Sequence, residues 1–84
     1  MKNFSYTTSG TCSQQINFNL DDQNRIHNLE FIGGCNGNLQ GISHLVENEE
    51  AQTVIQKCSG IRCGMKTTSC PDQLAKALSL ALQK

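Results

Sequence analysis

The chain has 84 residues, of which 37% are hydrophobic and 17% charged, and seven Lys+Arg residues balance seven Asp+Glu residues to a formal net charge of zero. This length predicts one domain over residues 1–84 with a small core, and it leaves little room for an enzyme with its own substrate cleft. Zero net charge argues against binding of nucleic acid through phosphate neutralisation and against a polybasic membrane-binding surface.

The chain also lacks the sequence features of membrane-spanning and secreted proteins. No apolar run approaches the length of a membrane span, and residues 1–8 contain no apolar segment of a secretory signal. We therefore expect a cytoplasmic protein whose thiols stay reduced. A chain of this kind is better suited to holding a cofactor, a metal or a protein partner than to catalysis on its own.

Alternation of apolar and polar residues predicts strands in the first part of the chain. Phe4 and Tyr6 alternate with polar residues, and residues 15–20 alternate cleanly. Residues 25–32 predict the returning strand of a hairpin, joined to the previous strand by the turn-forming residues 21–24. Because apolar residues fall on both faces of this returning strand, we expect it to be the central strand of the sheet.

Helical spacing of apolar residues predicts three helices in the rest of the chain. Residues 39–46 and 51–58 each carry one apolar stripe, the first made of Leu39, Ile42, Leu45 and Val46. A last helix over residues 71–82 begins with Pro71, which suits a first turn, and with Asp72 and Gln73, which we expect to serve the helix cap. Strands followed by helices predict an α+β domain, a small antiparallel sheet of about three strands with helices packed on one face.

The chain contains five cysteines, and four of them lie at breaks between predicted elements. Cys12 lies between two strands, Cys35 follows a Gly-Gly pair between a strand and a helix, and Cys63 lies in a loop. Cys70 lies next to the start of the last helix. Cys58 lies on an apolar helical stripe instead, so we expect it to be a small hydrophobic residue of the core.

The positions of these four cysteines favour thiolate chemistry. Thiolates rather than thiols bind metals, and a helix N-terminus favours negative charge, which suits Cys35 and Cys70. Four thiolates fit a tetrahedral Zn²⁺ site or an iron–sulfur cluster. The chain has no C-x-x-C pair of the zinc-ribbon kind. Spacing alone therefore leaves three alternatives open: a metal site, thiols without a ligand, and a disulfide pair, which the expected compartment disfavours.

Four short motifs, each with one cysteine, follow one another along the chain. They are Gly-Thr-Cys-Ser at residues 10–13, Gly-Gly-Cys-Asn-Gly-Asn at 33–38, Gly-Ile-Arg-Cys-Gly at 60–64 and Thr-Ser-Cys-Pro-Asp at 68–72. With these motifs the chain resembles, over about residues 10–82, the TSCPD domain, which is named after the last of them. TSCPD domains occur as small stand-alone bacterial proteins and at the C-terminal end of cobalamin-dependent ribonucleotide reductases.

The resemblance implies a metal-binding accessory module related to ribonucleotide reductase and DNA precursor synthesis, with a protein partner. It implies that zinc or an iron–sulfur cluster is bound by Cys12, Cys35, Cys63 and Cys70. The chain is too short for the catalytic barrel of the reductase, so we expect no reductase activity from it alone.

A more distant likeness is to iron–sulfur scaffold proteins of the SufE/NifU (IscU) fold. In these scaffolds a hairpin leads through a Gly-Cys turn into a helix, and a later helix opens with another cysteine. The matching cysteines here are Cys12, Cys35 and Cys70. Ser13 follows the first where the scaffolds soon have an Asp, and Ser69 precedes the last where they have a His. Cys63 would replace the missing ligand, and four thiolates would form a closed, structural site.

Two other functions stay open at this stage. One is a thiol redox carrier that cycles a cysteine pair between dithiol and disulfide, and the other is a metal-free interaction domain. Arg62 and Lys66 flank Cys63 and are either solvated charges or charges that offset a thiolate cluster. We expect His27 and His44 to be surface or hydrogen-bonded histidines rather than ligands.

Overall fold

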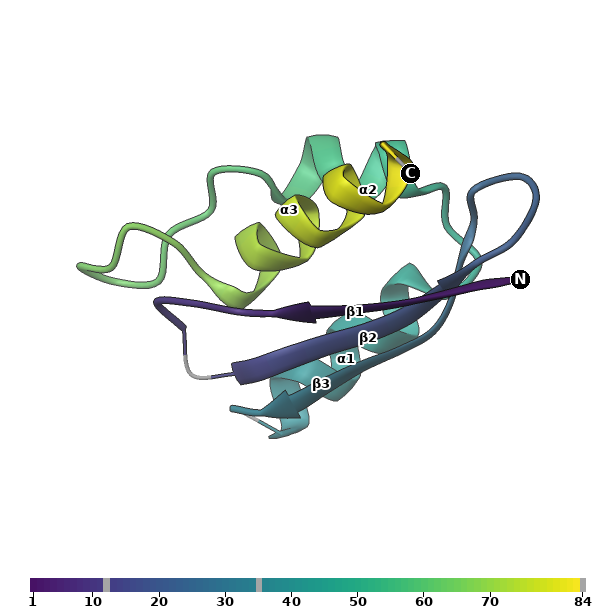
Figure 1. The fold of residues 1–84 in the computed structure, drawn as a ribbon. Helices are drawn as coiled ribbons and strands as arrows, with labels where there is room; N and C mark the ends of the chain where they lie inside the picture. Colours follow the sequence, from purple (N-terminus) through teal and green to yellow (C-terminus); the bar gives the residue numbers. More distant parts are fainter. Residues whose placement is uncertain (12, 35, 84) are drawn as a thin grey trace.

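The computed structural model describes residues 1–11, 13–34 and 36–83, and in this part of the chain three strands precede three helices (Figure 1). The elements are β1 (Lys2–Thr7), β2 (Ser13–Leu20), β3 (Ile26–Gly33), α1 (Asn36–Val46), α2 (Ala51–Cys58) and α3 (Cys70–Leu82). The strands form one antiparallel sheet in the order β1-β2-β3. The predicted α+β class and its three-stranded antiparallel sheet are confirmed.

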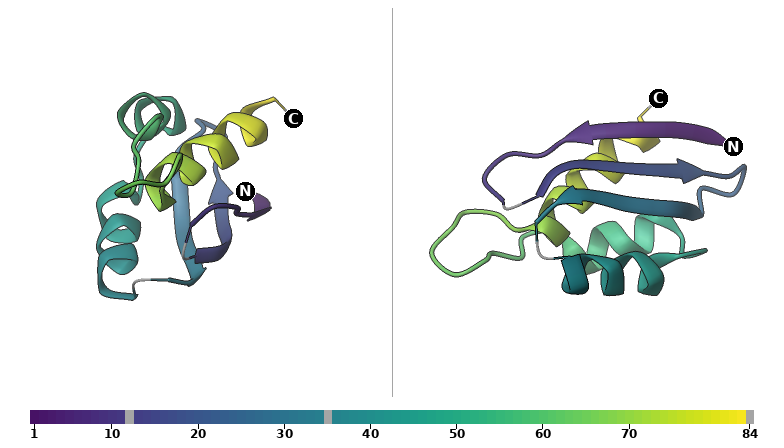
Figure 2. Two further views of the ribbon diagram at one scale, coloured as in Figure 1. Left: turned by 90° about the vertical axis from the view of Figure 1, so that its left-hand side faces the viewer. Right: turned by 90° about the horizontal axis from the view of Figure 1, so that it is seen from below.

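The helices gather on one side of the sheet. α3 packs against β1 and β2, α2 packs beside α3, and α1 runs along β3. Figure 2 shows, in its right-hand view, that no described helix is drawn over the opposite face of the strands. None of the helices in the described ranges is both long enough and apolar enough to cross a membrane.

β2 supplies the centre of the core. Its alternation is the one expected from the sequence: the buried side chains are Ile16, Phe18 and Leu20. Leu74 and Leu78 of α3 are also fully buried and belong to the same hydrophobic cluster. Because each fully buried leucine of this kind contributes about 1.5–3 kcal/mol, the contact between α3 and the sheet is a major part of the stability of so small a domain.

β3 lies at an edge of the sheet, so the prediction that it is the central strand is wrong. The pairing of β2 with β3 shifts register next to Asn28, whose φ is 58°. This irregularity puts Ile26 and Leu29, three residues apart, both into the core, while Ile32 is 40% exposed. The apolar residues on both faces of the predicted strand therefore reflect a β-bulge and not a second covered face.

The helices lie close to their predicted positions. α1 begins at Asn36, three residues before the predicted helix over residues 39–46. Leu45, which was expected on its apolar stripe, is 79% exposed and does not face the core. α2 has the predicted bounds, and α3 begins at Cys70. Cys58 is only partly buried, but it packs against the core as expected, and burial raises the pKa of its thiol.

Candidate functional site

The chain segments that contain the four predicted ligands gather at one end of the molecule. The β1–β2 connection, the end of β3, the loop between α2 and α3, and the start of α3 all lie at the left of Figure 1, and the view from below in Figure 2 agrees. Cys12 and Cys35 themselves lie outside the described residues. Ser13 and Gly33, which lie one and two residues from them in the sequence, are paired across β2 and β3.

Cys63 and Cys70 are the two predicted ligands that the structure describes, and neither forms a disulfide within the described residues. Cys70 is the first residue of α3 and is buried, whereas Cys63 is exposed in the loop that precedes the helix. The backbone N–H of Cys63 donates to the carbonyl of Thr68 (3.1 Å), and the N–H of Lys66 donates to the carbonyl of Cys63 (3.0 Å). The loop therefore folds back beside the residues that lead into α3.

Ser69 is the N-cap of α3. Its Oγ accepts a hydrogen bond from the backbone N–H of Asp72 (3.2 Å) and donates one to the carbonyl of Ile61 (2.7 Å). Pro71 lies in the first turn, as predicted. Asp72 and Gln73 take part in this cap through their backbone N–H groups, which donate to Oγ and the carbonyl oxygen of Ser69. Their side chains also bind more distant segments, at Gly60 and Ser9.

The carboxylate of Asp72 connects both ends of the loop to the helix. Its Oδ1 accepts the backbone N–H of Gly60 (2.7 Å), its Oδ2 accepts the hydroxyl of Thr68, and Lys76 Nζ lies 3.7 Å from Oδ2. The hydrogen bond from Thr68, followed by that from Gly60, holds the pKa of Asp72 below its usual value. The buried carboxylate is therefore ionised at neutral pH and fastens the loop at two points.

Gln73 connects a third segment to the same network. Its side chain is 2% exposed; Nε2 donates to Thr68 Oγ1 (3.0 Å), and Oε1 accepts the backbone N–H of Ser9 (3.2 Å). Gly10, next to Ser9, has a φ of 74°, and a Cβ there would lie 3.0 Å from Cγ2 of Thr68. Only a glycine allows the segment before Cys12 to approach Thr68 this closely without displacing it.

Sequence reasoning missed this polar network. Its signal was present as a group of polar residues around Cys70 at the start of an apolar helix, and the structure buries all four of them: Thr68, Ser69, Asp72 and Gln73. Every buried side-chain nitrogen and oxygen in the described residues has a hydrogen-bond partner. Within the described residues this polar network is therefore closed, in the sense that its buried side-chain groups satisfy one another.

The described residues contain no group of three or more His, Cys, Asp or Glu side chains arranged to hold a metal ion. Cys12 and Cys35 lie outside the described ranges, so the four-cysteine site stays a prediction. The donor set still fits a metal, because four thiols on converging segments match the ligands of a zinc or iron–sulfur site.

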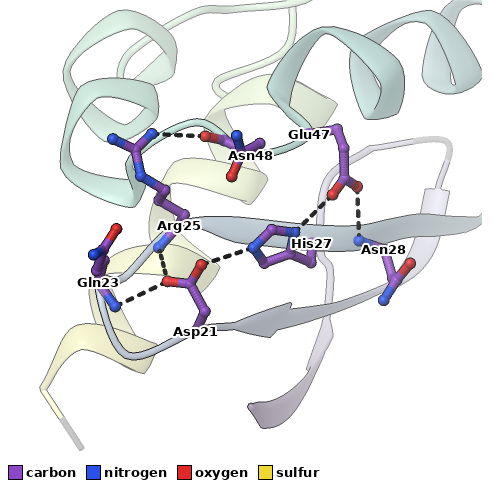
Figure 3. Close-up of polar contacts among 7 residues, drawn as sticks. All are labelled: Asp21, Gln23, Arg25, His27, Asn28, Glu47 and Asn48. Atoms are coloured by element: carbon purple, nitrogen blue, oxygen red, sulfur yellow. Dashed lines mark hydrogen bonds and ion pairs between the residues drawn. The ribbon is translucent and has the colours of Figure 1, made fainter.

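A second polar cluster lies at the opposite end of the molecule, around His27 (Figure 3). His27 Nε2 lies 2.8 Å from Asp21 Oδ2, and Nδ1 lies 2.8 Å from Glu47 Oε2. The hydrogen bond to Asp21, then that to Glu47, raises the pKa of His27. Both ring nitrogens donate only in the protonated imidazole, so the geometry fits a charged His27 between two carboxylates. His27 is thus a satisfied histidine, as expected.

Both carboxylates of this cluster also accept backbone hydrogen bonds. Asp21 Oδ1 accepts the N–H groups of Arg25 and Gln23, both at 2.9 Å, and Glu47 Oε1 accepts the N–H of Asn28, also at 2.9 Å. The bond from Arg25, with that from His27 next, lowers the pKa of Asp21 to about 2. The bond from the Asn28 N–H is the largest cause that lowers the pKa of Glu47. This cluster fastens the β2–β3 turn to the end of α1.

No curated protein and no solved structure matches the chain, so the distant likeness to SufE/NifU-type scaffolds is not confirmed. The TSCPD domain family matches residues 1–82, nearly the whole chain. The match includes the residues of the closed polar network and the segments that converge on the cysteine end. On this match, the chain belongs to the TSCPD domain family.

Proposed function

We propose that this TSCPD domain binds a metal, as Zn²⁺ or as an iron–sulfur cluster, and serves a protein partner in ribonucleotide reduction and DNA precursor synthesis. The proposed ligands are Cys12, Cys35, Cys63 and Cys70. The observation that carries the proposal is the convergence of four cysteine-bearing segments, distant in the sequence, on one end of the sheet. We propose an accessory role for this domain, as its membership of the TSCPD family suggests.

The electrostatics of this end suit an anionic metal site. A divalent zinc ion with four thiolates has a net negative charge, which needs compensation nearby. Cys70 lies in the first turn of α3, where free N–H groups favour negative charge. Arg62 and Lys66 are exposed on either side of Cys63 and bring two positive charges to the same loop. We therefore assign these two residues the task of offsetting thiolate charge.

A bound metal would also stabilise the least anchored part of the domain. Residues 60–67 are exposed. The N–H of Gly60 bonds to Asp72 of α3, and the N–H of Cys63 bonds to the carbonyl of Thr68, which lies just before α3. Because the unfolded chain has no preformed site, the free energy of metal binding adds to the free energy of folding. We expect the metal-free protein to be folded in its sheet and helices but less stable in this loop.

Native mass spectrometry of protein purified without oxygen from zinc- and iron-supplemented cells tests the proposal. We expect one zinc ion per chain, or a brown protein with the visible absorbance of an iron–sulfur cluster. Replacing any one of the four ligands by serine should reduce the metal content several-fold, because a closed four-coordinate site tolerates no missing thiolate.

Cys58→Ser is the matched control, because Cys58 packs at the edge of the core. This variant should keep the metal. A wild-type protein that is folded, metal-free and unchanged in thermal stability by added zinc would overturn the proposal. Loss of metal in Cys58→Ser alone would show that the ligand set is wrong.

The contrast between an exposed and a buried thiol favours a thiol redox carrier as a second candidate. Cys63 is exposed and Cys70 is buried, and their segments are joined by the hydrogen bond between Cys63 and Thr68. In this reaction two thiols would form one disulfide, while their two electrons and two protons reduce a disulfide of the partner protein. Differential alkylation of reduced and oxidised protein should then find one reversible pair. Finding no redox-dependent pair would exclude this candidate.

A further inference from the structure

Gln73 is a buried amide at a position where the core does not need one. The buried residues that follow it in α3 are all leucine or alanine. Burying an amide costs about 1–3 kcal/mol unless its hydrogen bonds are made. A leucine or methionine would fill the space without that cost, so the amide must be explained by the groups that it binds.

The two partners of Gln73 lie on two different cysteine-bearing segments. Ser9, whose N–H donates to Oε1 (3.2 Å), lies three residues before Cys12 in the sequence, and 64 residues separate it from Gln73. Thr68, whose Oγ1 accepts from Nε2 (3.0 Å), lies two residues before Cys70. A single side chain therefore joins the segment leading into the first cysteine to the segment leading into the last.

The hydrogen bonds around Gln73 all run in one direction, toward the carboxylate of Asp72. A hydroxyl has one proton, and Thr68 donates it to Asp72, so Thr68 has only a lone pair to offer Gln73. This fixes the orientation of the amide, with its NH₂ on Thr68 and its oxygen on the N–H of Ser9. Such a directed chain of hydrogen bonds is stronger than its separate members, because each bond polarises the next.

We infer that Gln73 is a positioning residue of the proposed metal site, which holds the segment before Cys12 against the Thr68–Cys70 segment and is not itself a ligand. The close approach of Gly10 to Thr68 supports the same contact from the other side. The inference rests on the proposed function, since it concerns how the first cysteine is brought to the other three.

Zinc protection of individual cysteines from alkylation, read by peptide mass spectrometry, tests this role. In the zinc-loaded wild-type protein we expect protection of Cys12, Cys35, Cys63 and Cys70, but not of Cys58. Gln73→Met keeps the length and apolar bulk of the side chain and removes both hydrogen bonds. In this variant the alkylation rate of Cys12 should rise about tenfold, the size expected when a buried hydrogen bond is lost and its partner left unsatisfied. The rates of Cys63 and Cys70 should rise much less.

Leu78→Ala is the control for a purely structural effect, because Leu78 is fully buried in the same helix but makes no contact of this kind. It should lower stability and leave the pattern of protection unchanged. If Gln73→Met does not fold, Gly10→Ala disturbs the same contact from outside α3 and should also expose Cys12 selectively. An equal rise at all four cysteines, or no rise at Cys12, would overturn the inference. Loss of protection in the wild-type protein would instead overturn the proposed function, and the inference with it.

Discussion

The two ends of this domain are fastened in different ways. At the cysteine end, one buried carboxylate, Asp72, accepts a backbone N–H and a hydroxyl, and the network continues through Gln73 to Ser9. At the opposite end, His27 lies between Asp21 and Glu47 in a partly exposed cluster (Figure 3). Both clusters join segments that are distant in the sequence, but only the first is shielded from water.

This difference in burial predicts which end keeps its geometry when pH and salt change and which end responds to them. The side chains of Asp21 and Glu47 are 28% and 46% exposed, so water and salt weaken their attraction to His27. Asp72 is 7% exposed, and breaking its hydrogen bonds would leave buried groups without partners. The cysteine end is therefore expected to keep its geometry over a wide range of conditions, as a ligand site requires, while the histidine end responds to pH.

The largest effect is expected for Asp72→Asn. The amide has one acceptor oxygen where the carboxylate has two, so either Gly60 or Thr68 loses its acceptor. We expect a loss of about 2 kcal/mol in the free energy of unfolding, because these are buried bonds to a charged group. Urea denaturation measures the loss, and hydrogen exchange at the amide of Gly60 should become faster.

Asp21→Asn is the matched control for this variant, because it removes the same charge at the exposed end. Its effect on the free energy of unfolding should be clearly smaller than that of Asp72→Asn. Equal losses in the two variants would contradict the proposed difference between the buried and the exposed cluster.

A smaller effect is expected when the cap of α3 is removed. Ser69→Ala deletes the acceptor for the N–H of Asp72 and the donor to the carbonyl of Ile61. N-cap substitutions of this kind cost about 1 kcal/mol. Thermal denaturation should show this loss, whereas Ser79→Ala, in the C-terminal half of the same helix and away from the cap, should change the melting temperature little. If the two serine variants behave alike, Ser69 does not act as a cap.

How much of this structure the sequence could predict depends on how local each feature is. Residues 15–20 and 71–82 were predictable because their periodicity is set within a few neighbours, and the structure confirms both as β2 and α3. The place of β3 was not predictable, because the pairing of β2 with β3 has two register shifts, and the one beside Asn28 changes which residues face the core. A reading of alternation alone cannot detect such a bulge.

In the candidate site, too, only the locally determined features could be predicted from the sequence. The motifs identify the cysteines and the family, because a motif is a local pattern of residue types. The contact between Gln73 and Ser9 depends on chain segments that only folding brings together, and no spacing in the sequence indicates it. The sequence therefore indicates only the local role of Asp72 and Gln73 at the helix cap, although their side chains also bind Gly60 and Ser9, which are distant in the sequence.

The smallest expected effect concerns pH at the histidine end. The pKa of His27 is raised, so its contribution to stability is fully present below its ordinary value of 6.5 and is lost as pH rises through the raised value. The pKa values of Asp21 and Glu47 are lowered, so their contributions are present above ordinary values of 3.8 and 4.5 and are lost as pH falls below them. The cluster is therefore at full strength between about pH 4.5 and 6.5.

The difference in melting temperature between wild-type protein and His27→Gln isolates this contribution. It should be largest inside that pH window, decrease as the pH is raised, and shrink when salt is added, because the cluster is partly exposed. His44 is exposed, as expected, but its charge also acts on Glu47, so the His27→Gln variant is compared with the wild-type protein and not with a His44 variant. If the difference in melting temperature for His27→Gln does not depend on pH, the cluster stabilises the fold by packing and not by the charge of His27. The two ends of the domain would then differ in burial but not in their response to pH.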